Sequence, residues 1–207
     1  MNYKKLIIEF VGAFFLVLAV GMTGNPLIIG ATLMVMVYMG GHVSGAHYNP
    51  AVTFAVWMRK KISLEEGLQY MGVQLLGAVC AATLTWLMTH STPHASPTSD
   101  MHILKSLAAE MLGTFALATV VLHVAVAKSN SGNSFYGLAI GFTILAMAGT
   151  FGHVSGGAFN PAVGCGPIIV DMFNHGDSIK NIWLYIVGPF AGAGVAALVY
   201  GYTNPED

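Results

Sequence analysis

The residues best suited to do chemistry lie in one stretch that the chain contains twice. The first copy runs from His42 to Val52 (HVSGAHYNPAV) and the second from His153 to Val163 (HVSGGAFNPAV), with eight of eleven positions identical. An asparagine amide donates hydrogen bonds, and the carbonyls of glycine-rich backbone accept them. The duplicated stretch therefore indicates a site that offers donors and acceptors to a small molecule carrying oxygen.

Each copy ends in an asparagine followed by proline, which predicts the start of a helix. Asparagine is a favoured N-cap, and proline fits the first helical turn because its missing N–H costs nothing there. The apolar segments that follow, 49–58 and 160–170, are too short to cross a membrane and are expected to be buried or re-entrant. They begin with the motifs Asn49-Pro50-Ala51 and Asn160-Pro161-Ala162.

The composition is that of a membrane protein. Of 207 residues, 55% are hydrophobic and 8% charged, whereas soluble domains carry about 25% charged residues. With a net charge of −1, the chain has no excess of basic residues that would attract nucleic acid. Long apolar segments, each near the roughly 20 residues that a spanning helix needs, occur at 6–23, 27–42, 67–88, 106–127, 135–152 and 181–202.

The order of these segments predicts a single domain, 1–207, made of two repeats, 1–100 and 101–207. Each repeat holds three spans and one short helix, so the second must enter the membrane inverted. The fold class expected is an all-α membrane protein with six transmembrane helices and two re-entrant half-helices. The half-helices then meet by their positive N-terminal dipoles near the midplane, and the irregular backbone before them lines a watery cavity or is buried in protein.

Lysine and arginine in the short loops predict that both termini lie in the cytoplasm. Six such residues then fall inside and two, Lys105 and Lys180, outside, as the positive-inside rule requires. The first apolar run is interpreted as a retained helix and not a secretory signal, because Glu9–Phe14 resembles Glu110–Phe115.

Two other functions stay open from the residues alone. An ion-coupled transporter also uses inverted repeats and broken helices, and a closed structural or sensory protein would have a pore gated by dewetting. An enzyme is not expected, because the paired His42 and His153 are interpreted as loop-fixing residues and not as catalysts. No cofactor or metal is expected. The histidines of the longest loop (His90, His94, His102) are interpreted as solvated, and Cys80 and Cys165 as buried small hydrophobic residues.

The repeated Ser-Gly-x-x-x-Asn-Pro-Ala, the Glu-x-x-Gly of spans one and four, and the Gln/Pro-x-x-Gly of spans three and six resemble the aquaporins, or major intrinsic proteins. The resemblance covers nearly the whole chain. It implies a right-handed bundle, a homotetramer with one pore per subunit in the plasma membrane, and passive flow of water and small neutral solutes past paired Asn-Pro-Ala motifs that exclude protons and ions.

The resemblance also assigns roles to residues. Asn49 and Asn160 would be central donors, and Glu9 and Glu110, with His42 and His153, would fix the loops. Pore carbonyls would come from Gly45, Ala46, His47 and Tyr48 and from Gly156, Gly157, Ala158 and Phe159.

The sequence departs from the family at the position after the second Asn-Pro-Ala, where most members have arginine and this chain has Val163. The corresponding constriction would be formed by Ile29, Ala148, Gly157 and Val163, all of them apolar. We therefore expect a wider aperture without a charge barrier at this point. Valine here resembles some plant vacuolar members, so ammonia, urea and hydrogen peroxide are expected to accompany water, with glycerol a further candidate.

Overall fold

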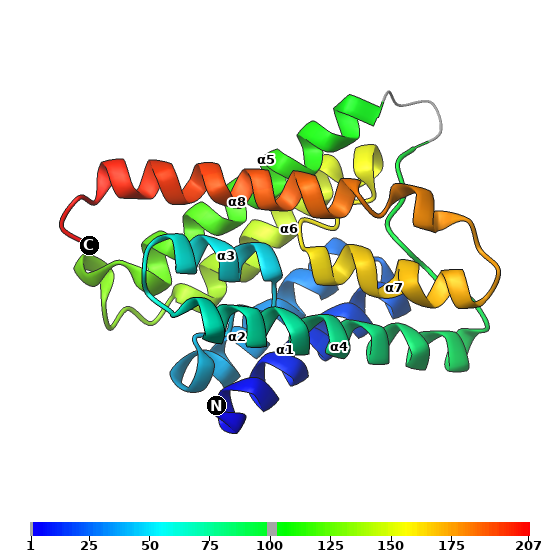
Figure 1. Cartoon of the computed structure of the whole chain (residues 1–207), viewed down its shortest axis with the longest axis horizontal. Coiled ribbons are helices and arrows are strands. Elements are labelled where there is room, and N and C mark those ends of the chain that lie inside the picture. The colour runs from blue at the N-terminus through cyan, green and yellow to red at the C-terminus, as the bar shows by residue number, and fades with distance from the viewer. Residues whose placement is uncertain (1, 99–102) are drawn as a thin grey trace.

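The computed structural model describes residues 2–98 and 103–207, and within these ranges every regular element is a helix. The predicted repeat boundary at 100/101 and His102 lie outside the described residues. Six helices are long and apolar enough to cross a membrane, which makes this a multi-pass membrane protein and confirms the predicted fold class. Both termini lie toward the same end of the bundle (Figure 1), which we call the terminal face.

The predicted segments all form helices, with ends displaced by a few residues. The long helices are α1 (Tyr3–Thr23), α2 (Pro26–Ser44), α4 (Leu64–Thr89), α5 (Ile103–Val121), α6 (Tyr136–Ser155) and α8 (Leu184–Thr203). The short ones are α3 (Pro50–Met58) and α7 (Pro161–Phe173). Helix α5 continues as one π-helical turn, Leu122–Val126, and single 3₁₀ turns span Lys128–Asn130 and Ser178–Asn181.

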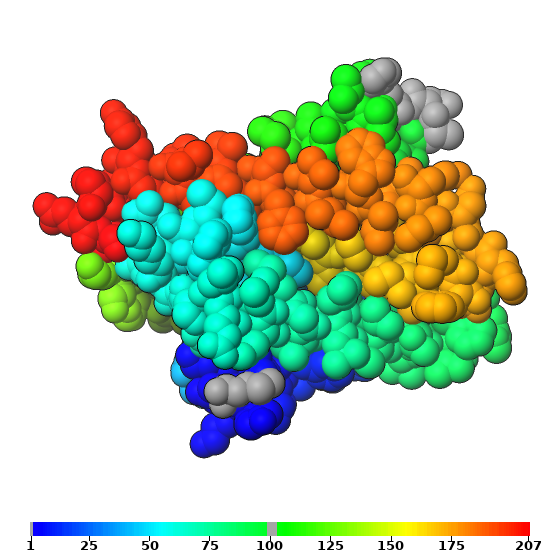
Figure 2. All heavy atoms as spheres, viewed as in Figure 1, coloured from blue at the N-terminus to red at the C-terminus, as the bar shows by residue number. Residues whose placement is uncertain are grey.

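Equivalent helices of the two halves make equivalent contacts. The most extensive packing joins α1 to α4 and α5 to α8, and α2 packs on its counterpart α6. The short helices α3 and α7 lie between α4 and α8, one toward each end of the bundle (Figure 1). Side chains of α3, α4, α7 and α8 close this side of the molecule into a continuous surface (Figure 2).

Two glycines at matching positions let the closest helix pairs approach. A Cβ atom on Gly77 of α4 would lie 2.6 Å from the carbonyl oxygen of Phe10 in α1. On Gly192 of α8 it would lie 2.1 Å from the carbonyl oxygen of Met111 in α5. Helices surrounded by lipid gain little from the hydrophobic effect when they associate. Small residues at their crossings instead allow the close backbone packing that holds them together. The Gln/Pro-x-x-Gly pattern thus marks two backbone contacts.

The two cysteines occupy different environments. Cys165 in α7 is buried, as predicted, but Cys80 in α4 is exposed, so the prediction that both are buried is wrong for Cys80. Large apolar side chains on the same helix, including Leu76 and Leu87, are also exposed. Cys80 therefore lies on an apolar outer surface of a kind that faces lipid in a membrane protein.

The glycine contact between α5 and α8 gives a first prediction. Replacing Gly192 with alanine places a methyl group against backbone that cannot move away, so we expect a loss of about 1–3 kcal/mol of stability, the usual cost of overpacking. The melting temperature in detergent would report it. Gly72→Ala is the matched control, because nothing lies within 4 Å of a Cβ at Gly72. Equal melting temperatures for the two variants would contradict the role of Gly192.

Candidate pore and its supporting loops

The two repeated asparagines cap the two short helices, as the sequence predicts. The Asn49 Oδ1 accepts a hydrogen bond from the Ala51 N–H at 2.8 Å. The Asn160 Oδ1 accepts one from the Ala162 N–H at 2.9 Å. With their side-chain oxygens held in this way, both asparagines turn their amide nitrogens away from the helices that they begin.

Each amide nitrogen reaches across to the loop of the other half. The Asn49 Nδ2 donates to the Phe159 carbonyl at 3.0 Å, and the Asn160 Nδ2 donates to the Tyr48 carbonyl at 2.9 Å. These two carbonyls were predicted to face the pore; the structure shows them accepting the asparagine amides. One N–H of each amide is used in this crossing, which leaves the second N–H of each side chain for another acceptor.

Two buried carboxylates hold the loops that precede the asparagines. The Glu9 carboxylate accepts the backbone N–H groups of His47 and Tyr48 at 3.0 and 2.8 Å. The Glu110 carboxylate accepts those of Ala158 and Phe159 at 3.0 and 2.7 Å. Both glutamates are fully buried. Their contacts match the predicted loop-fixing role, since the bonds satisfy backbone donors that irregular structure leaves open.

Serine and tyrosine side chains complete the support, in place of the predicted histidines. Ser44 donates to Glu9 at 2.6 Å and Ser155 to Glu110 at 2.7 Å. Within residues 2–98 and 103–207, the exposed rings of His42 and His153 form no hydrogen bond with either glutamate. The hydroxyls of Tyr70 and Tyr185 donate to the carbonyls of the same serines, at 2.8 and 2.6 Å.

The serines stood in the repeated motif and could have been found there. The tyrosines also repeat, because Tyr70 and Tyr185 each lie seven residues before the glycine of the Gln/Pro-x-x-Gly pattern. Their distance from the serines, 26 and 30 residues, hid the contact that they make. The prediction that the histidines brace the loops through the glutamates is therefore corrected.

The Glu-x-x-Gly pattern also makes room for the loop side chains. Tyr48 and Phe159 both have positive φ, at 52° and 49°, and both side chains are fully buried. A Cβ on Gly12 would lie 2.1 Å from the Tyr48 ring, and a Cβ on Gly113 would lie 2.3 Å from the Phe159 ring. Each glutamate thus binds a loop backbone, and the glycine one turn later admits that loop's aromatic ring.

A cavity of about 310 Å³ runs along the junction of these loops. Gly24 and Pro26, at the turn between α1 and α2, line one end, so the cavity reaches toward the face opposite the terminal face. Both asparagines line its deeper part. The four residues predicted for the constriction all line it too, as do apolar side chains of the long helices: Ile29, Ala148, Gly157 and Val163, together with Leu16, Leu33, Leu117, Ile140 and Ile144.

The predicted loop residues divide between this cavity and the terminal face. Ala46, His47, Gly156, Gly157 and Ala158 line the cavity. A second recess, toward the terminal face, is bounded by Gly45 and His42 and by residues 124–128, 130–133 and 136. Tyr48 and Phe159 line neither.

The neighbouring hydrogen bonds suggest an assignment for the tautomer of His47. The Thr53 hydroxyl donates its one proton to the Asn49 carbonyl at 3.0 Å and accepts from the Gln74 amide at 3.0 Å. The His47 Nδ1 lies 3.1 Å from the same hydroxyl, and with the hydroxyl proton on the Asn49 carbonyl we assign Nδ1 as the donor. In the neutral ring, Nε2 is then an acceptor, on a side chain that lines the cavity. Sequence reasoning counted only the backbone carbonyl of His47 and missed this acceptor.

The fold and this cavity define a transmembrane channel protein whose two halves contribute equally to its centre. Comparison with known proteins narrows the class. Residues 19–200 match the family model of the major intrinsic proteins, so the chain belongs to the major intrinsic protein family. It is a passive channel for water and small solutes.

Curated relatives cover most of the chain. The probable aquaporin NIP4-2 of Arabidopsis thaliana is 34% identical over 99% of this chain and 76% of its own length. Aquaporin AqpM of Methanothermobacter thermautotrophicus is 31% identical over 98% of both chains. The probable aquaporin TIP2-2 of Oryza sativa is 37% identical over 84% of this chain and 68% of its own length.

A solved structure has the same fold. The aquaglyceroporin from Plasmodium falciparum superposes with a TM-score of 0.84 over 96% of this chain and 95% of that one, at 24% sequence identity. At this level of identity the likeness concerns the fold alone.

The carboxylate support gives a second prediction. In Glu110→Gln, one acceptor oxygen is replaced by an NH₂ group. That group would face the N–H and hydroxyl groups that donate to Glu110 in the wild type. We expect the free energy of unfolding to fall by about 2–4 kcal/mol, because buried donors are left unsatisfied. Water flux should fall in proportion to the fraction of protein that remains folded. Thermal unfolding in detergent measures the first effect. Glu65→Gln, at an exposed glutamate, is the control and should behave as wild type.

The tautomer of His47 can be checked directly. Solid-state ¹⁵N spectra of the protein in bilayers should show a protonated Nδ1 and an unprotonated Nε2. Thr53→Val removes the acceptor for Nδ1 and should increase the other tautomer. A wild-type spectrum with the proton on Nε2 would contradict the hydrogen-bond assignment.

Proposed function

We propose that this channel passes water together with ammonia, urea and hydrogen peroxide, and that the second N–H of Asn49 and of Asn160 guides each molecule through its centre. The observation that carries the proposal is the crossing of the two amides. It holds both side chains in place while leaving one donor of each uncommitted beside the cavity. A molecule with an oxygen or nitrogen lone pair can accept those donors one after the other.

Exclusion of ions is proposed to arise at the same point. Helices α3 and α7 begin at the two asparagines and pack against each other there. Each N-terminus carries roughly half a positive charge from its helix dipole, so the two ends together repel a cation. The apolar walls of the cavity add the cost of removing the ion's water.

Selection among neutral solutes is proposed to occur at Ile29, Ala148, Gly157 and Val163. Three of these are small or lack a side chain, which favours a broad aperture, and none carries a charge or a side-chain hydrogen-bond donor. The polar side chains that line the same cavity belong to His47, His153, Asn49 and Asn160. Size and desolvation, and not charge, would therefore decide which neutral solute passes, with glycerol near the upper limit.

The orientation and assembly follow from sequence and family. The loop basic residues Arg59, Lys60, Lys61 and Lys128 belong to the terminal face, which supports a cytoplasmic location for it and for both termini. The plasma membrane and a homotetramer, with one pore per subunit, are proposed on the family resemblance. The proposed repeat organisation, 1–100 and 101–207, agrees with the matched helix contacts.

Substitution of Val163 tests the selectivity proposal. In proteoliposomes, wild type should raise water and urea permeability above protein-free vesicles by stopped-flow light scattering. Val163→Arg fills the aperture and adds a charge, so urea permeability should fall about tenfold while water flux falls less.

Val163→Leu separates size from charge, because leucine adds bulk without a charge or a donor. It should lower urea permeability moderately. Wild-type vesicles with no permeability above protein-free vesicles would overturn the proposed function and favour a closed structural relative. Saturable uptake coupled to an ion gradient would instead favour a transporter.

A further inference from the structure

The connection between α4 and α5 makes contacts that the pore described above does not explain. Residues 90–98 of this connection, which we call the strap, run from the end of α4 across α7 to the end of α6. No strap residue lines the cavity. The strap nevertheless touches the loop that forms the cavity wall, and it is attached on both sides of that contact.

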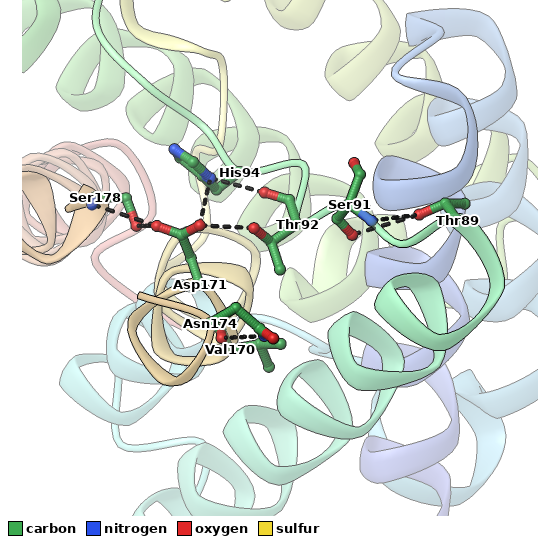
Figure 3. Close-up of polar contacts among 8 residues, drawn as sticks. All are labelled: Thr89, Ser91, Thr92, His94, Val170, Asp171, Asn174 and Ser178. Carbon is green, nitrogen blue, oxygen red and sulfur yellow. Dashed lines mark hydrogen bonds and ion pairs between the residues drawn. The ribbon is translucent and has the colours of Figure 1, made fainter. Parts of the chain in front are cut away.

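The first attachment is to Asp171, near the end of α7. The Thr92 hydroxyl donates to Asp171 Oδ1 at 2.6 Å, and His94 Nδ1 lies 3.9 Å from the same oxygen and 2.8 Å from the Thr92 carbonyl. The second carboxylate oxygen accepts from the Ser178 hydroxyl at 2.5 Å. Figure 3 shows Asp171 between Ser178 on one side and Thr92 with His94 on the other. One carboxylate thus ties the strap to α7 and to the loop after it.

The environment keeps this carboxylate charged. Burial raises the pKa of Asp171, but hydrogen bonds from Ser178 and Thr92, with His94 nearby, more than offset this, so the pKa lies below its ordinary value. Gly176 supplies the space, since a Cβ there would lie 2.0 Å from an Asp171 oxygen. The attachment is therefore intact throughout the neutral range, and it weakens only as the pH falls through that lowered pKa.

The second attachment is to the end of α6, just before the pore loop. The Thr98 hydroxyl donates to the His153 carbonyl at 2.5 Å, and the Thr98 N–H donates to the Val154 carbonyl at 3.3 Å. Between the two attachments the strap backbone lies on Gly156. A Cβ on Gly156 would be 2.5 Å from the Ser96 nitrogen and 2.8 Å from the Ala95 Cα.

The segment under the strap is a pair of glycines. Their N–H groups donate to the Gly152 carbonyl at 2.9 Å and to the Ser155 hydroxyl at 3.2 Å. Gly156 and Gly157 have φ of +88° and +66°, and both line the cavity. Consecutive glycines have no side chains to lock them and have more backbone freedom than other residues. The first half has alanine, Ala46, in place of Gly157, and the nearest atoms to a Cβ on Gly45 belong only to His47.

From these contacts we infer that Thr92 and Asp171 are positioning residues for solute selectivity, which they maintain by holding the strap against the Gly156-Gly157 wall. The inference rests on the proposed function, in which Gly157 forms part of the constriction. Because the wall at this point is backbone without side chains, its position depends on what lies behind it. Releasing the strap should let the wall move outward and admit larger neutral solutes.

The test uses Thr92→Val, which keeps the shape of the side chain and removes the hydroxyl, and Thr92→Ser, which restores the hydroxyl. Thr83→Val is the matched control, since Thr83 is exposed on α4 and bonds only its own helix. In proteoliposomes, Thr92→Val should raise the ratio of glycerol to water permeability severalfold. Thr92→Ser and Thr83→Val should keep the wild-type ratio, and Asp171→Asn should follow Thr92→Val.

Hydrogen–deuterium exchange of the same proteins separates this inference from the proposed function. Thr92→Val should speed exchange at 155–159 and leave 44–48, the matching loop of the first half, at the wild-type rate. Wild-type exchange at 155–159 in Thr92→Val would overturn the inference whatever the flux, and so would faster exchange with an unchanged permeability ratio. Wild-type vesicles without any flux would overturn the proposed function, while the exchange result would still decide whether the strap holds the wall.

Discussion

The structure depends on satisfying the hydrogen bonds of irregular backbone at membrane depth. Hydrocarbon offers no partner to an unpaired N–H, yet the loops before Asn49 and Asn160 are neither helix nor strand. Glu9 and Glu110 resolve this by accepting two backbone N–H groups and one serine hydroxyl each. Each glutamate thus places two acceptor oxygens among these donors, which suits a loop whose left-handed residues are costly to hold.

The two halves satisfy that constraint in different ways. Glu9 accepts a further hydrogen bond, at 2.7 Å, from the Gln74 amide. The matching position in the second half is Pro189, which has no side-chain donor. The second loop is instead covered by the strap between α4 and α5, whereas among the described residues, apart from its chain neighbours, only His47 lies within 4 Å of a Cβ on Gly45, the counterpart of Gly156. The two halves therefore share the same backbone arrangement, but a glutamine side chain supports the first loop and the strap supports the second.

Much of this architecture could be predicted because it leaves a local signal in the sequence. Asparagine before proline predicts a capped helix, and Glu-x-x-Gly recurs since each copy holds the same kind of loop. The length and hydrophobicity of the apolar segments predicted the six spans. What the sequence did not predict depends on residues brought together by the fold: Thr92 meets Asp171 across 79 positions. His42 and His153 were prominent because they repeat, but the serines two residues after them make the contacts with the glutamates.

The tautomer of His47 illustrates the same limit. Its assignment needs Thr53, Gln74 and the Asn49 carbonyl in one place, and no spacing rule connects residues from a loop, a short helix and a long helix. Similarly, the Gly-Gly pair was predicted only as pore backbone. That it lies under a strap follows from the path of a connection whose composition indicated no more than a solvated loop.

The crossing of the two asparagine amides has a consequence for how the protein is made. The Asn49 amide donates to the carbonyl of Phe159, a residue synthesised 110 positions later. Until then the first re-entrant loop has its glutamate but not its partner at the centre. Insertion of α1 to α4 can therefore precede closure of the centre, but it cannot complete it. The centre of the pore therefore forms only after the second half of the chain has been synthesised and its loop has reached Asn49.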